Sequence, residues 1–176
     1  LLNDLEATAY GALFLDEAGV RTLNTGRPHA HHRAVIAAGT GLGQAILYWD
    51  GNRYHPSATE GGHVDFAPRS PREAQCHAFV QRTQQRVSYE HLLSGPGLYA
   101  IFRFLTHELA RPVNTDVQTQ LHNAQDPSAM IGTAGVEGRC PTCREAVEMF
   151  VDIYGAQAGN LALTVMATGG VYLGGG

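Results

Sequence analysis

The 176-residue sequence predicts an α/β domain in which helices cover a mixed β-sheet. Short strand-like segments cluster between residues 34 and 57, helical patterns occupy residues 71–168, and a strand-like run follows at 169–173. A meander followed by helices and a further strand fits such a layered fold. The length and the 44% hydrophobic content are those of one globular domain.

The first predicted elements are a helix and a three-strand meander. Apolar residues recur with helical spacing between residues 4 and 17, and Asn3 or Asp4 is a residue type that caps a helix start. The Asp50-Gly51-Asn52 sequence indicates a tight hairpin turn. The strands are predicted at 34–38, 45–49 and 53–57.

The rest of the chain is predicted to be mainly helical. Ser70-Pro71 is typical of a helix start and predicts a helix over 71–87, and Ser88 is expected to cap a short helix that contains Glu90. The sequence Ser94-Gly95-Pro96-Gly97 breaks the chain before another helix, and residues 110–126 are predicted to form a connection. Further helices are expected to about Leu109, over 127–136 and over 141–168.

Composition excludes several classes of partner. A net charge of −4 with 12 Lys and Arg residues gives no basic surface for nucleic acid. Three cysteines do not make a disulfide framework and indicate a reducing compartment, so we expect a cytoplasmic protein. The start of the chain lacks a basic secretory segment, and the apolar run 161–176 is short and glycine-rich, so no membrane partner is expected.

The ends of the sequence predict a fragment. The chain starts at Leu1 without a methionine and stops in Gly174-Gly175-Gly176 directly after a strand-like run. A fold would ordinarily continue at such a point, so we expect truncation at both ends.

The run Gly39-Thr40-Gly41-Leu42-Gly43 lies between two predicted strands. Glycines lack a Cβ atom, so backbone N–H groups in such a turn can approach a phosphate closely. A glycine-rich hairpin that binds no ligand fits the same pattern.

The sequence Glu60-Gly61-Gly62-His63 can direct a carboxylate and an imidazole towards one small polar ligand, such as a sugar. Glu-x-x-His also occurs on helices in metal sites. Here the glycines disfavour a helix and a second such motif is missing, so no metal ion is expected to be bound by Glu60 and His63. By itself, His63 could also be an ordinary hydrogen-bonded histidine.

Other candidate residues have ordinary structural interpretations. Asp4 on its own is a helix cap, and Glu90 on its own favours the positive end of a helix dipole. Cys140 and Cys143 lack the neighbouring strand of a redox motif and the extra ligands of a zinc site, so a structural role is favoured. Cys76 has no partner by sequence.

Five segments of the chain carry a further pattern: Leu1-Leu2-Asn3-Asp4, Ala38 to Gly43, Glu60 to Pro68, Leu92 to Leu98 and Gly169 to Gly175. Taken together, they resemble the bacterial glucokinase family in order and spacing along the whole chain. The resemblance implies an actin-like ATPase (ribonuclease H-like) fold, with residues 1–176 as the large C-terminal domain and the small N-terminal domain absent. The related zinc-binding kinases carry a denser Cys and His cluster, so the resemblance is to the zinc-free branch.

The resemblance also implies an activity and a set of site residues. The implied reaction is ATP-dependent phosphorylation of glucose at the 6-hydroxyl, the first step of glycolysis, with Mg²⁺ as cofactor and a homodimer as the assembly. Asp4 matches the catalytic base. The sugar contacts match Asn3, Glu60, His63 and Glu90, and the ATP contacts match Gly39, Thr40, Gly41, Gly169, Gly170 and Gly174.

Two qualifications accompany this assignment. The fragment alone is expected to be inactive, because the family's first phosphate loop would precede Leu1. The alternative function is a non-catalytic sugar-sensing module of the same fold, against which the Asn3-Asp4 pair argues.

Overall fold

The computed structural model describes residues 4–16, 18–27 and 29–175, with the backbone alone at residues 4–6. The chain forms two compact units, which we describe separately. Unit 1 comprises Leu1–Ala38, Gly43–Gly62 and Ala156–Gly176, and unit 2 comprises Gly39–Leu42 and His63–Gly155.

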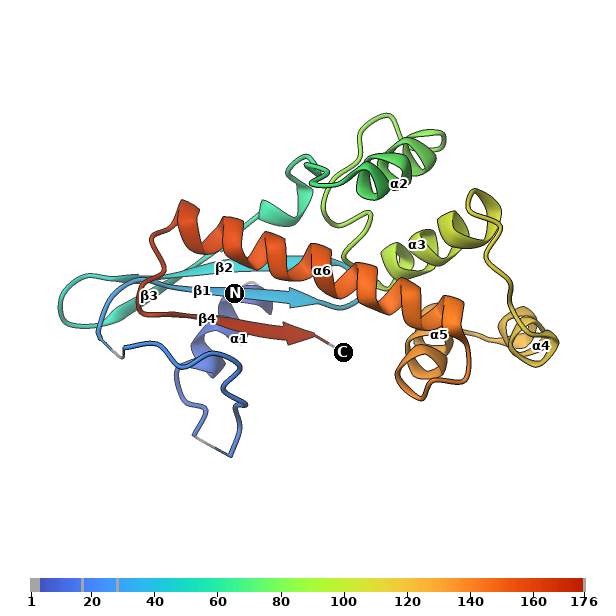
Figure 1. Cartoon of the computed structure of the whole chain (residues 1–176). Coiled ribbons are helices and arrows are strands. Elements are labelled where there is room, and N and C mark those ends of the chain that lie inside the picture. The colour runs from blue at the N-terminus through green and yellow to red at the C-terminus, as the bar shows by residue number, and fades with distance from the viewer. Residues whose placement is uncertain (1–3, 17, 28, 176) are drawn as a thin grey trace. The chain divides into compact units, whose positions relative to one another are not determined.

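Unit 1 is built on a four-stranded sheet with the order β3-β2-β1-β4. Strand β4 pairs parallel with β1, and β3 pairs antiparallel with β2, so the sheet is mixed (Figure 1). The predicted mixed sheet with a three-strand meander is therefore confirmed. The strands are β1 (Arg33–Ala38), β2 (Leu42–Trp49), β3 (Tyr54–Thr59) and β4 (Gly170–Gly175).

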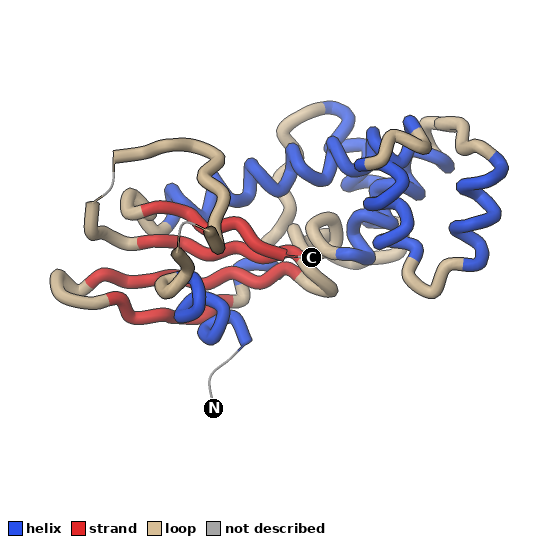
Figure 2. The backbone as a smooth tube through the Cα atoms, turned by 90° about the horizontal axis from the view of Figure 1, so that it is seen from below, coloured by secondary structure: helices blue, strands red, loops and turns tan. Residues whose placement is uncertain are grey.

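Helices lie on both faces of this sheet. On one face, helix α1 (Asp4–Ala12) packs Ala9 and Ala12 against a cluster that includes Val35 and Leu47. The carboxyl-terminal turns of α6 (Pro141–Thr164) lie over the other face (Figures 1 and 2). Buried β-branched and aliphatic side chains on alternate faces of β1 supply the core on each side.

Helix α1 is shorter than the predicted helix over 4–17. After Ala12 the chain turns through bonds from the N–H of Leu13 to Tyr10 O and from the N–H of Phe14 to Gly11 O. The Phe14 side chain is 84% exposed, so the apolar pattern beyond Ala12 has no core to pack against. A helical pattern of apolar residues forms a stable helix only where those residues pack against the rest of the protein.

The Asp50-Gly51-Asn52 turn joins β2 to β3 as predicted. Asp50 Oδ1 accepts from the N–H groups of Asn52 and Arg53, both at 2.8 Å, and Gly51 has a φ of 99°. Those hydrogen bonds and the contact with His55 hold the pKa of the Asp50 carboxyl well below its usual range.

Unit 2 is helical, with a core that includes Phe104, Leu92, Ile131 and Ile153. The predicted start of α2 is confirmed, because the Ser70 side chain accepts from Glu73 N–H and Pro71 begins the helix. Its helices are α2 (Pro71–Gln81), α3 (Gly95–His107), α4 (Thr115–Asn123), α5 (Pro127–Val136) and the amino-terminal turns of α6.

Several predicted boundaries in unit 2 are wrong. Helix α2 ends at Gln81, and Glu90 lies in a series of turns instead of a short helix. Residues 115–123, predicted as part of a connection, form α4, capped by the Asn114 side chain at the N–H of Val117. In unit 1, helix α6 ends at Thr164, four residues before the predicted end.

Among the described residues, no helix combines the length and the apolar character that a membrane crossing requires.

Candidate functional site

His63 and Glu90 are brought together by a short antiparallel pairing within unit 2. Asp65 and Ser88 form an isolated antiparallel bridge. The N–H of Phe66 donates to Val87 O at 2.9 Å, and the N–H of Tyr89 donates to Val64 O at 3.1 Å. In this register His63 is opposite Glu90, and His63 Nδ1 lies 3.7 Å from Glu90 Oε1.

The same pairing explains why Ser88 caps no helix. Its backbone N–H donates to His91 Nδ1 at 3.0 Å, and its hydroxyl lies 3.1 Å from the same nitrogen. Arg86 supports the opposite segment, because its guanidinium donates to the carbonyl of His63 at 2.5 Å and lies 3.2 Å from Asp65. Neither residue was a candidate from sequence: Arg86 acts on the backbone of His63, 23 residues away, and His91 acts on Ser88 in a turn that the sequence pattern assigned to a helix.

The glycine-rich turn Gly39–Leu42 belongs to unit 2. Glu90 Oε2 accepts from the N–H of Leu42 at 2.9 Å, and the N–H of Gly95 donates to Gly39 O at 2.8 Å. Within the described part of the chain, the N–H groups of Thr40 and Gly41 donate to no protein acceptor. The turn therefore has free backbone donors of the kind that bind phosphate.

The Ser94-Gly95-Pro96-Gly97 segment starts helix α3 and holds Glu90 in place. The Ser94 hydroxyl donates to Glu90 O at 2.8 Å and accepts from the N–H of Gly97 at 3.1 Å. A Cβ atom on Gly97 would lie 2.4 Å from the carbonyl carbon of Leu92, so only glycine fits there. The segment predicted as a break is thus an N-cap with a close backbone approach.

Glu60 follows strand β3 in unit 1, whereas His63 and Glu90 belong to unit 2. Thr59 beside it is fixed within unit 1: its hydroxyl donates to Gln44 O at 3.2 Å and accepts from the N–H of Gly61 at 3.1 Å. The role of Glu60 as a sugar contact stays a prediction.

The two predicted residues at the start of the chain are not placed as a site. Asn3 lies outside the described residues. Asp4 is the first residue of α1, and the structure describes its backbone alone. Their roles stay predictions.

The predicted adenosine-side glycines lie at β4. A Cβ on Gly169 would lie 2.4 Å from His31 O, whereas the position at Gly174 has ordinary contacts. Gly175, which is not among the predicted site residues, has a φ of 131°, and a Cβ atom there would lie 2.0 Å from Ala38 O. Glycine is therefore required at Gly169 and Gly175 by the close parallel pairing of β4 with β1, independently of any nucleotide contact.

Cys140 and Cys143 are both free and fully buried. Cys140 Sγ accepts from the N–H of Cys143 at 3.3 Å, so it occupies the cap position at the start of α6. Burial, followed by the contact with Cys140, raises the pKa of the Cys143 thiol to about 12. This geometry favours the structural interpretation of the pair.

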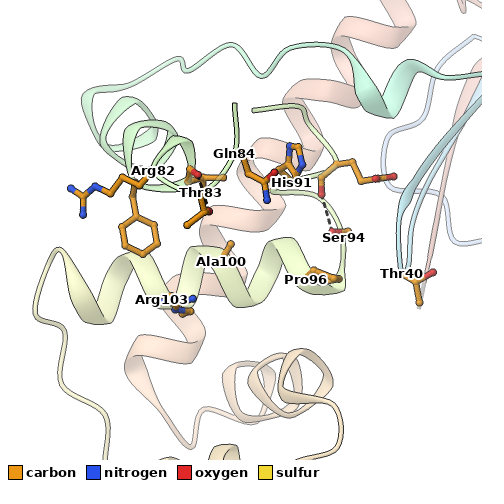
Figure 3. A pocket seen from close by; sticks show the side chains of 12 residues that line it. Thr40, Arg82, Thr83, Gln84, His91, Ser94, Pro96, Ala100 and Arg103 are labelled. Carbon is orange, nitrogen blue, oxygen red and sulfur yellow. Dashed lines mark hydrogen bonds between the residues drawn. The ribbon is translucent and has the colours of Figure 1, made fainter. Parts of the chain in front are cut away.

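A cavity of about 390 Å³ opens between the end of α2 and the first half of α3 (Figure 3). Phe79, Val80 and Ala100 form its apolar walls. Thr40 and Glu90, which belong to the candidate site, also line the cavity. Among the described residues, no group of three or more His, Cys, Asp or Glu side chains could hold a metal ion.

Comparisons with known proteins identify the fold and the family. A glucokinase from an Antarctic psychrotroph is 28% identical, with a TM-score of 0.84 over 99% of this chain and 52% of that chain. A glucokinase from Balamuthia mandrillaris, solved in complex with glucose, is 22% identical, with a TM-score of 0.71 over 94% of this chain and 48% of that chain. The fold is therefore the actin-like α/β fold of the glucokinases.

The sequence comparison agrees with the structural one. The glucokinase of Nostoc sp. is 42% identical over 190 residues, covering 100% of this chain and 55% of the relative. The glucokinase family model matches residues 1–176. The chain belongs to the glucokinase family, and it spans about half the length of the relatives that it matches.

Proposed function

We propose that the intact protein containing this chain transfers a phosphoryl group from ATP to the 6-hydroxyl of glucose. The observation that carries the proposal is the register of residues 64–66 with 87–89, which sets His63 opposite Glu90 beside a turn with free backbone donors. The family match over the whole chain supports it. Sugar-binding side chains next to a phosphate-binding turn are what this reaction requires.

The sugar is held by polar side chains from two segments and the start of the chain. Asn3, Glu60, His63 and Glu90 are the proposed contacts to the glucose hydroxyls. A carboxylate accepts hydrogen bonds from sugar hydroxyls, and an imidazole can donate or accept. Because an unpaired buried polar group costs about 1–3 kcal/mol, these contacts also disfavour sugars that lack a matching hydroxyl.

Asp4 is the proposed general base. Its carboxylate would accept the proton of the 6-hydroxyl as that oxygen attacks the γ-phosphorus in line. Phosphoryl transfer depends mainly on positioning and on stabilising charge, and well-oriented reactants can lower the barrier by roughly 7–11 kcal/mol. The sugar contacts therefore act chiefly by holding one hydroxyl in place.

The nucleotide is the proposed ligand of the glycine-rich segments. The N–H groups of Thr40 and Gly41, with Gly39 beside them, would bind phosphate oxygens, and Gly169, Gly170 and Gly174 would line the adenosine side. Mg²⁺ enters as part of the Mg-ATP substrate, since this ion is usually held through substrate phosphates with one or two carboxylates.

The chain corresponds, in this proposal, to the large domain of the enzyme. A small domain would supply the remaining phosphate contacts, and closure of the two domains on the sugar would exclude water. We propose a cytoplasmic homodimer with glucose and ATP as its ligands.

The test is the Asp4→Asn variant of the intact protein, assayed by coupled spectrophotometry with glucose binding measured by calorimetry. Loss of a general base lowers kcat by about 10²- to 10⁴-fold, while glucose binding is expected to persist. Asp16→Asn, at an exposed position beyond α1, is the matched control and should keep its turnover. Retention of most activity in Asp4→Asn would rule out Asp4 as the base. Glucose binding without turnover in the unaltered protein would instead favour the sugar-sensing function.

A further inference from the structure

The carboxylate of Glu90 touches two parts of the proposed site at once. Its Oε2 accepts from the N–H of Leu42 at 2.9 Å, within the proposed phosphate-binding turn. Its Oε1 lies 3.7 Å from Nδ1 of His63, a proposed sugar contact. The two oxygens belong to one rigid planar group, so a movement of one of them moves the other.

The contact between Glu90 and the turn is close. A Cβ atom on Gly41 would lie 2.8 Å from Glu90 Oε2, so the glycine makes room for the carboxylate. The segment from Glu90 to Gly95 makes a second hydrogen bond to the turn, because the N–H of Gly95 donates to Gly39 O at 2.8 Å. The turn Gly39–Leu42 and Glu90 both belong to unit 2.

This arrangement has an electrostatic consequence for a bound nucleotide. Glu90 occupies the N–H of Leu42 and leaves those of Thr40 and Gly41 for phosphate. A carboxylate at the edge of an anion-binding turn also repels phosphate charge. Hydroxyl groups that donate to the carboxylate would spread its charge and fix its position.

We propose that Glu90 is a positioning residue that couples sugar occupancy to nucleotide binding. Glucose bound at His63 and Glu90 holds the carboxylate against Leu42, which orients the turn and reduces the repulsion that the phosphates experience. The proposal rests on the proposed function and assigns the link between its two substrates to one carboxylate. Such a link is reciprocal, so ATP tightens glucose binding by the same factor.

The test measures the coupling factor, the ratio of the dissociation constants of Mg-AMPPNP without and with saturating glucose, by calorimetry on the intact protein. Coupling between sites is typically at least about fivefold, and we expect that in the unaltered protein. Glu90→Ala is expected to bring the factor below about twofold. Glu60→Gln is the matched control, because it removes a proposed sugar carboxylate and leaves the Glu90–Leu42 bond in place.

A pair of glycine variants tests the same contact without altering Glu90. Neither Gly39 nor Gly41 has a positive φ, so alanine suits the backbone at both positions. A Cβ on Gly39 meets nothing within 4 Å, whereas a Cβ on Gly41 displaces the Glu90 carboxylate. Gly41→Ala should therefore lose the coupling, and Gly39→Ala should keep it even if its affinity for the nucleotide changes.

The outcomes separate this inference from the proposed function. If glucose is phosphorylated but the coupling factor is below twofold in the unaltered protein, or is unchanged in both Glu90→Ala and Gly41→Ala, the coupling role is wrong and the function stands. If the intact protein binds no glucose, the function itself fails. A readout that needs no ligand is amide hydrogen exchange: Glu90→Ala should speed exchange at Leu42, and unchanged exchange would overturn the inference.

Discussion

The side-chain amide of Gln44 lies against Gly61. A Cβ atom on Gly61 would lie 2.3 Å from Gln44 Oε1 and 3.1 Å from Thr59 Oγ1. Gln44 is only 2% exposed, so its side chain has little space into which to retreat. Gly61 has no positive φ, and the requirement for glycine beside Glu60 is therefore steric.

Gly61→Ala is expected to lower the free energy of unfolding by about 1–3 kcal/mol, the usual cost of overpacking. It should also weaken glucose binding, because Glu60 is adjacent to the displaced segment. Urea unfolding and calorimetry measure the two effects. Gly11→Ala is the control, since a Cβ at Gly11 in α1 meets nothing within 4 Å.

A double-mutant cycle with Gln44→Ala tests the cause. Removing the Gln44 amide takes away the closest atom, so Gly61→Ala should cost less in the Gln44→Ala background. An equal cost in both backgrounds would show that another group causes the destabilisation.

Two glycines of α5 should respond in opposite directions to substitution by alanine. A Cβ on Gly135 would lie 2.8 Å from the backbone oxygen of Cys143, which cannot easily move, whereas one on Gly132 makes only an ordinary contact with Leu98 at 3.8 Å. Gly132→Ala is therefore expected to stabilise the protein by up to about 1 kcal/mol through helix propensity. Gly135→Ala should destabilise it by at least about 1 kcal/mol. The melting temperatures of the two variants test this prediction. An increase for both would contradict the close packing of α5 against α6 at Gly135.

Local sequence signals predicted the sheet well because they act over a few residues. The strand 34–38 and the hairpin turn at Asp50 match β1 and the β2–β3 turn closely. The start of α2 at Ser70-Pro71 could be predicted equally well, because a capping residue and a proline in the first turn are local features of the sequence.

The candidate site depended on contacts between distant segments, which the sequence does not encode locally. Glu90 was expected on a short helix, yet the pairing of residues 87–89 with 64–66 holds it in turns. Helix α4 was missed because its sequence is polar, and its cap at Asn114 was the available signal. The bond from Leu42 to Glu90 spans 48 residues and is visible only in the fold.

The buried thiols predict a decline in stability at alkaline pH. Burial raises the pKa of Cys76 to about 12, whereas a thiol in an unfolded chain has a pKa of about 8.5. Above that pH the folded state binds more protons than the unfolded state, so stability is complete below about pH 8.5 and falls as the pH rises towards 12.

Urea unfolding between pH 7 and 10.5 measures this decline. Cys76 should contribute a slope that approaches about 1.4 kcal/mol per pH unit above its unfolded pKa. Cys76→Ala should show a shallower decline, although its stability at pH 7 is lower because a buried side chain is truncated. An unchanged slope would mean that Cys76 ionises alike in both states.

Ser94 should matter more than Ser70, although both cap a helix. Each hydroxyl accepts from a backbone N–H three residues on, at 3.1 Å, and loss of such a cap costs about 0.5–2 kcal/mol. The Ser94 hydroxyl also donates to Glu90 O at 2.8 Å, so Ser94→Ala leaves that carbonyl without this donor and loosens the segment that positions Glu90.

Ser94→Ala should thus lower the urea midpoint at least as much as Ser70→Ala, because it loses a second hydrogen bond besides the cap, and Ser94→Ala alone should raise the KM for glucose several-fold. Steady-state kinetics on the intact protein below each variant's unfolding temperature gives the comparison. If the two variants had the same KM for glucose, Ser94 would act only as a helix cap. Loss of a cap that does not move Glu90 lowers stability but leaves substrate binding unchanged.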